Sequence, residues 1–118
     1  MPNHSQLSQA KFNRLDMAIR TAMLQNEAAL ANSDPDDTDL RDRLVTDYDA
    51  LWGQRREAHE LRKTYVMSNL QPSAAEKRLT KRADDAKDWV DSVNNLAKVL
   101  KTVGKIAEIL AKLTAELV

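Results

Sequence analysis

The order of apolar and polar residues along the chain predicts three long helices. Apolar side chains recur three or four residues apart over three stretches, which is the spacing of one helical face. The first stripe is Leu7, Phe12, Leu15, Ile19, Ala22, Asn26, Ala29 and Leu30; the second is Leu40, Leu44, Tyr48, Leu51, Trp52, Ala58, Leu61, Tyr65 and Val66; the third is Leu79, Ala83, Ala86, Val90, Val93, Ala97, Leu100, Val103, Ala107, Leu110 and Leu113.

Two short polar segments separate these stripes and set the predicted helix ends. Residues 32–35 and 69–72 each end in a proline, and Pro35 suits the first position of a helix. The third stripe stays in phase through Asn94 and Asn95 and past Gly104, so we predict one continuous final helix. The predicted helices cover residues 5–32, 35–69 and 74–118. A break at Asn94–Asn95 or at Gly104 is the alternative that the pattern leaves open.

Short connections make consecutive helices antiparallel neighbours. The predicted fold is therefore all-α, an antiparallel up-down-up three-helix bundle with a long C-terminal helix, in a single domain over residues 1–118. Counting outward from the two turns places Trp52, Trp89 and Leu15 at one height, so we expect them to form one core layer.

The final helix is longer than the second, so its last turns should extend beyond the bundle by roughly 15 Å. These turns are apolar on one face, and each Leu or Ile left in water forgoes about 1.5–3 kcal/mol. Self-association, with a dimer favoured, is the expected cover. A different protein, a membrane surface or a fold-back of the helix onto its own bundle are the alternatives, and the membrane is the least favoured because Glu108 and Glu116 dilute the basic side. The predicted interface is Val99, Val103, Ile106, Ile109, Leu110, Leu113 and Leu117.

Composition agrees with a helical domain and narrows the chemistry. The chain has 118 residues, of which 42% are hydrophobic, with two glycines and no cysteine. Few glycines and prolines disfavour a turn-rich β fold, and the lack of cysteine removes disulfides and thiolate sites. The first ten residues are polar and no long apolar run follows, so we expect a cytoplasmic protein.

Charge is balanced overall but not along the chain. The net charge is zero, yet residues 33–52 carry seven aspartates against two arginines, whereas residues 53–82 are mainly basic. A basic end could bind nucleic acid or another anionic surface, and this is the alternative function. Its candidate residues are Arg55, Arg56, Arg62, Lys63, Lys77 and Arg78.

The sequence offers little for catalysis. Metal sites on helical bundles use Glu-x-x-His, but Arg56 stands three residues before His59. The acidic segment from Asp34 lacks the glycine and glutamate that a calcium loop needs. We therefore predict no catalytic, cofactor-binding or metal-binding residues and no cofactor. The expected function is a non-catalytic protein–protein interaction module, such as an adaptor, inhibitor, regulator or structural subunit.

Overall fold

The described part of the chain folds into four helices and contains no strand. The computed structural model describes residues 4–67 and 72–117, with the side chains of residues 9–65 and 74–117. The helices are α1 (His4–Ala31), α2 (Thr38–Met67), α3 (Pro72–Ser92) and α4 (Leu96–Leu117). The prediction of an all-α fold is confirmed, whereas the prediction of three helices is wrong.

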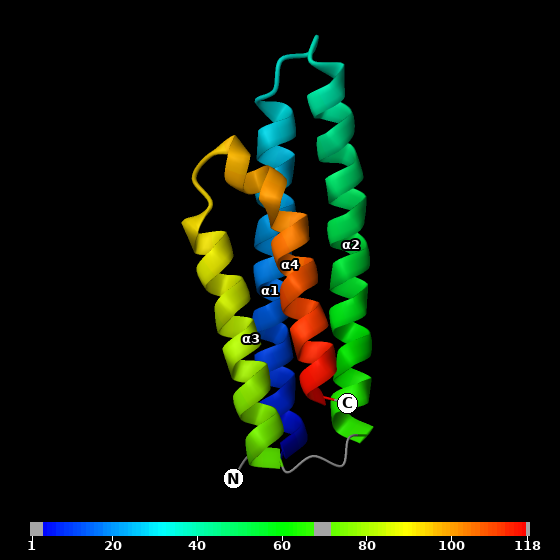
Figure 1. Cartoon of the computed structure of the whole chain (residues 1–118), viewed down its shortest axis with the longest axis vertical. Coiled ribbons are helices and arrows are strands. Elements are labelled where there is room, and N and C mark those ends of the chain that lie inside the picture. The colour runs from blue at the N-terminus through cyan, green and yellow to red at the C-terminus, as the bar shows by residue number, and fades with distance from the viewer. Residues whose placement is uncertain (1–3, 68–71, 118) are drawn as a thin grey trace.

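The helices form a rod of 54 × 21 × 17 Å. Consecutive helices run in opposite directions, as predicted (Figure 1). α1 packs against both α2 and α3, and α4 packs against α3 and α2 on the other side, so α1 and α4 face each other across the bundle. The end of the α1–α2 hairpin projects beyond the turn between α3 and α4 (Figure 1).

The turn between α1 and α2 differs in detail from the prediction. α2 begins at Thr38, not at Pro35. Asp34 closes a tight turn, accepting a hydrogen bond at its side chain from the amide of Asp36 at 2.9 Å. Asp37 then caps the helix, because its carboxylate accepts the amide of Leu40 at 3.2 Å. The aspartates thus compete for the backbone amides that an earlier helix start would use.

The predicted continuous final helix is wrong. α3 ends at Ser92, and α4 begins at Leu96 and returns alongside α3 and α2. The return buries Ile106, Leu110 and Leu113 completely in their own chain. An extended helix would keep a few more backbone hydrogen bonds but would leave these side chains in water, and the burial is the larger effect. The overhang expected at the C-terminal end is therefore absent.

Side chains satisfy the backbone groups that the break exposes. At the end of α3, Ser92 donates to the carbonyl of Trp89 at 2.7 Å, and Gln25 of α1 donates to that of Val90 at 2.8 Å. Lys98 donates to the carbonyl of Ser92 at 3.1 Å. A helix end leaves such carbonyls without partners inside the helix, and these three side chains take the place of the missing donors.

Asn95 caps the start of α4. Its side-chain oxygen accepts the amide of Lys98 at 2.9 Å. Replacing Asn95 by alanine should lower the free energy of unfolding by about 1 kcal/mol, as measured by urea denaturation. Asn94→Ala is the matched control and should change stability less, since Asn94 accepts only an exposed hydrogen bond from Asn95 at 3.1 Å. Equal effects of the two substitutions would contradict the assigned cap.

The core runs along the middle of all four helices. Leu15, Leu79 and Leu110 are among its fully buried residues, and Trp89 packs against it from the edge while donating its indole N–H to Thr102 at 3.1 Å. Trp52 does not join them: its side chain is 45% exposed. The predicted layer of the two tryptophans and Leu15 is therefore wrong, because α2 turns Leu51 rather than Trp52 inward.

Candidate functional site

The residues predicted to form a self-association surface are covered by their own chain. The side chains that carry most of the apolar area on α4 are at most 3% exposed. The prediction that this face lies open to solvent is wrong, because the fold-back seats it against the other three helices. Buried in this way are Ile106, Ile109, Leu110, Leu113 and Leu117, while Val99 and Val103 are half-buried.

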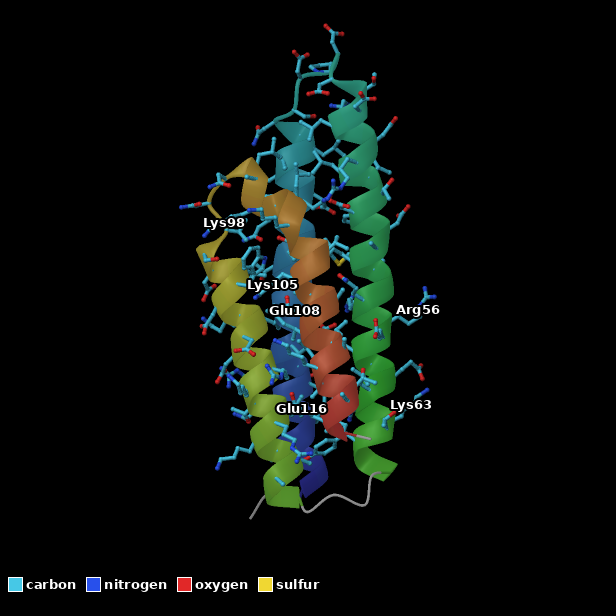
Figure 2. All side chains as sticks on the ribbon, in the orientation of Figure 1. Arg56, Lys63, Lys98, Lys105, Glu108 and Glu116 are labelled. Carbon is cyan, nitrogen blue, oxygen red and sulfur yellow. The ribbon has the colours of Figure 1, made fainter. Side chains whose placement is uncertain are left out.

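The six basic candidates do not form one surface. Arg55 lies against Asp16 of α1 at 2.7 Å, and Arg78 donates to the backbone carbonyl of Glu116 in α4. Arg56 and Lys63 point away from the bundle on the outer side of α2 (Figure 2). The other two candidates, Arg62 and Lys77, lie on α2 and α3 respectively. Lys63 also contacts Glu60, at 3.4 Å, so three of the six have polar contacts within the chain.

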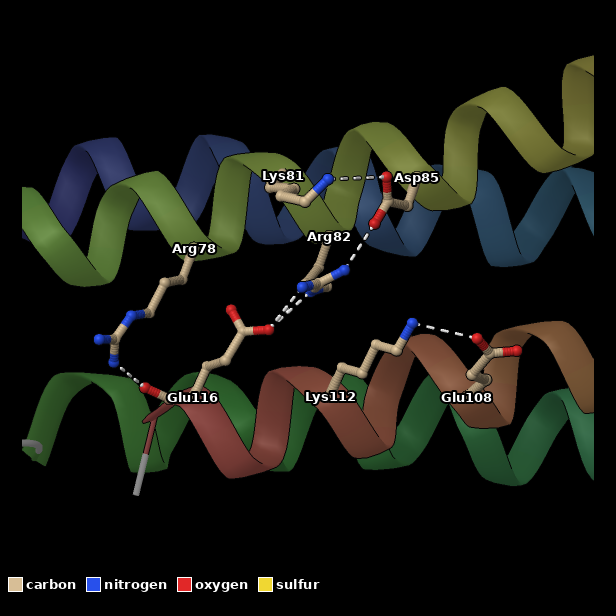
Figure 3. A network of polar contacts seen from close by, with 7 residues as sticks. All are labelled: Arg78, Lys81, Arg82, Asp85, Glu108, Lys112 and Glu116. Carbon is tan, nitrogen blue, oxygen red and sulfur yellow. Dashed lines mark hydrogen bonds and ion pairs between the residues drawn. The ribbon is translucent and has the colours of Figure 1, made fainter.

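The polar side of α4 is used to hold α4 against α3. Arg82 of α3 contacts Glu116 at 2.7 Å and also Asp85 on its own helix at 2.8 Å (Figure 3). Lys112 and Glu108 pair along α4 at 3.1 Å. These contacts explain why charged residues lie opposite the apolar stripe of α4 without a membrane or another partner.

An apolar surface does exist elsewhere, on the side of α1 and α2 that faces solvent. Met17 and Leu24 of α1 are 57% and 64% exposed, and Val45 and Trp52 of α2 are 50% and 45% exposed. Within each helix the two residues are seven apart, so they lie on the same helical side. With the half-buried Tyr48, these five residues define what we call the α1–α2 apolar face.

A shallow groove of about 390 Å³ runs along this face between the two helices, and Leu24 and Trp52 line opposite sides of it. The guanidinium of Arg55 lies over the Trp52 ring, 5.3 Å from its centre, which fixes one face of the indole. Tyr48 bonds to Glu27 of α1, and this hydrogen bond, with partial burial, raises the pKa of the tyrosine above its usual value. On the α2 side of the groove, Tyr48, Trp52 and Arg55 are thus held by polar or cation–π contacts.

Asp16 anchors the lower part of the groove. Besides Arg55, its carboxylate lies 3.2 Å from His59 Nε2 and 4.0 Å from Arg20. Through Arg55 and His59, this carboxylate links α1 to α2. His59 of α2 therefore contacts α1 through Asp16.

The sequence held a signal for this surface. Met17, Leu24 and Val45 are apolar residues that fall outside the core stripes of their helices. Trp52 stands next to Leu51, at the edge of the core stripe of α2. Apolar residues seven apart on two neighbouring helices, off the core phase, were the pattern that could have indicated the face.

Other kinds of site find no support in the described residues. No group of three or more His, Cys, Asp or Glu residues there is arranged to hold a metal ion. In the same part of the chain, no helix has the length and apolar character needed to cross a bilayer. Comparison of the chain with protein-family models, curated protein sequences and solved structures gives no match, so function has to be argued from the surface of the molecule itself.

Proposed function

We propose that this chain is a non-catalytic protein–protein interaction module whose binding surface is the α1–α2 apolar face. The observation that carries the proposal is the exposure of Trp52, Leu24 and Met17 side by side on two helices. Large clusters of exposed apolar residues are rare on monomeric domains, and many of them are interaction sites. Tryptophan and tyrosine are also the residues that most often dominate binding energy at interfaces.

The character of the face favours a helical partner. Apolar residues on two neighbouring helices match the apolar side of a helical partner, which would lie along the rod. The groove side chains are fixed by Arg55–Asp16 and Tyr48–Glu27, so less side-chain freedom is lost on binding. The self-association expected from the sequence is kept in this proposal, but its site moves from α4 to α1 and α2.

The anionic-partner alternative has weaker support. Arg55 and Arg78 are engaged within the chain, and Lys63 contacts Glu60 at 3.4 Å. Phosphate binding depends on several unpaired cations that act together on one surface. The apolar face needs no such rearrangement.

Photocrosslinking tests the proposal. A benzophenone amino acid in place of Trp52 should give a covalent adduct in cells that express the full chain, because this position would lie inside the interface. The same probe in place of Lys101, an exposed residue of α4, is the control and should give none. Adding Leu24→Glu should reduce the adduct at position 52 by about tenfold or more, since a charge in the apolar part of an interface is strongly unfavourable.

The negative result is equally clear. Absence of an adduct at position 52, or an adduct of unchanged yield in the Leu24→Glu chain, would show that the α1–α2 apolar face is not a binding surface. Because Leu24 is 64% exposed, its substitution leaves the core intact, and circular dichroism of the purified variant confirms that it is folded.

A further inference from the structure

The outer side of α2 carries two acidic residues followed by two basic residues, evenly spaced along the helix. Asp42, Asp49, Arg56 and Lys63 follow one another at intervals of seven residues and are all exposed. Residues seven apart lie on one helical side, and Arg56 and Lys63 do point outward together from α2 (Figure 2). The sign of the charge changes between Asp49 and Arg56, and Trp52 and Gly53 occupy the midpoint.

This row of charges is complementary to the same row on a second copy that runs in the opposite direction. When two copies of α2 lie antiparallel and cross at Trp52–Gly53, residues equally far from the crossing come to the same level. Asp49 then meets Arg56 of the second copy, and Asp42 meets Lys63. A parallel arrangement would set like charges against each other, so the series selects one direction.

The exposed apolar residues of α1 fit the same two-fold arrangement. Contacts of Arg55 with Asp16 and of Tyr48 with Glu27 show that the level of Trp52 corresponds to Arg20 and Thr21 on α1. Leu24 and Met17 lie on either side of that level. Turning one copy about the midpoint therefore brings Leu24 opposite Met17 of the other, apolar against apolar.

The crossing point has room for a second helix. Gly53 sits in the interior of α2 at a cost of about 1 kcal/mol relative to alanine. A Cβ built on it meets no atom of the described chain within 4 Å, so crowding inside the monomer does not require glycine here. Glycine does allow a helix from another molecule to approach closely.

We propose that the partner of the α1–α2 apolar face is a second copy of this chain, docked antiparallel about a two-fold axis that passes near Trp52–Gly53. The inference rests on the proposed function and names its occupant. The interface is isologous: the same surface of both copies takes part, with the two tryptophans at the centre and two symmetry-related Asp49–Arg56 pairs beside them.

A charge exchange tests both the partner and its direction. Sedimentation equilibrium of the full chain over a dilution series should give twice the chain mass of 13.3 kDa. Asp49→Arg and Arg56→Asp should each raise the dimer dissociation constant by roughly tenfold, because each sets like charges together twice. An equimolar mixture of the two variants should recover the dimer, because in the mixed pair every like-charge contact becomes an opposite-charge contact.

Matched variants separate the interface from general effects. Asp88→Arg and Lys101→Asp make the same charge changes at exposed positions on α3 and α4 and should leave the dissociation constant unchanged. Gly53→Leu should weaken the dimer while the monomer stays folded. Gly104→Leu is its control, since a Cβ there is equally free of contacts in the described chain.

Failure of this inference is distinguishable from failure of the proposed function. A chain that stays monomeric at every concentration, or single variants that the mixture does not rescue, would overturn the antiparallel self-pairing. If in that case the probe at position 52 still gives a Leu24-dependent adduct with a mass other than twice that of the chain, the face binds a different protein. Loss of both results removes both proposals.

Discussion

Replacing Leu110 by alanine should lower the free energy of unfolding by about 2–5 kcal/mol. Leu110 is fully buried on the inner side of α4, within the core shared by the four helices. The substitution removes apolar contacts and leaves a cavity that rigid neighbouring helices fill only in part. Urea denaturation, followed by the circular dichroism of the helices, measures this loss of free energy. The loss is a large fraction of the total stability of a small domain.

Leu96→Ala is the matched control on the same helix. Leu96 is 42% exposed at the start of α4, so its truncation should cost well under about 1 kcal/mol. A Leu110→Ala chain as stable as the Leu96→Ala chain would mean that the apolar face of α4 is not packed inside the monomer. That result would favour the continuous final helix expected from the sequence.

High pH should destabilise the fold through Tyr65. Its ring is 1% exposed and meets Phe12 edge-on, while its hydroxyl donates to Glu76 at 2.9 Å. Burial, followed by the hydrogen bond and charge of Glu76, raises the pKa of Tyr65 well above its usual value of about 10. The contribution of this group is complete below pH 10. Above that pH the unfolded chain loses the phenol proton and the folded chain keeps it, so unfolding becomes easier as pH rises.

The expected loss from Tyr65 is about 1.4 kcal/mol at pH 11 relative to pH 9, since each pH unit between the two pKa values contributes that amount. Urea denaturation at both pH values measures it, with Tyr65→Phe as the comparison, because phenylalanine cannot ionise. Tyr65→Phe should lose stability at pH 9 through the missing hydrogen bond but show a smaller further loss at pH 11. An identical alkaline loss in both chains would assign the effect to other groups, such as the lysines.

The first half of the fold was predictable because its signals are local. The stripes of α1 and α2 have helical spacing, and a polar segment with a proline stands between them. The predicted start of α2 was early because Asp34 and Asp37 are both good caps, and the choice between them depends on the turn that Asp34 closes with Asp36. Neighbouring caps of equal quality leave a helix start uncertain by a few residues.

The second half was not predictable from spacing alone. Val90, Val93 and Ala97 keep the helical phase across the break, so periodicity indicates a single helix. What ends α3 is a tertiary effect. α4 packs between α3 and α2, and side chains of α1 and α4 donate hydrogen bonds to the carbonyls at the end of α3. The spacing of apolar residues describes each helix separately, so it does not show whether packing of α4 against α2 and α3 outweighs the continuation of α3.

The candidate site was missed for a related reason. Leu51 and Trp52 both belong to the predicted core stripe of α2. The structure keeps that phase and buries Leu51, whereas Trp52, at the edge of the stripe, lines the groove with Met17 and Leu24. Spacing gives the middle of the buried side of a helix but not its width, so it does not show that Trp52 lies outside it.

The uneven length of the two hairpins also determines where the molecule is stiff. At the acidic end, α1 and α2 continue past the α3–α4 turn (Figure 1). Trp52 lies midway along α2, where Gln54 on the same helix reaches the backbone of Val103 at 2.8 Å and α4 closes the bundle behind it. Local opening of the helices should therefore be most frequent at the hairpin tip and rare near Trp52. The groove would then lose little conformational entropy when a partner binds.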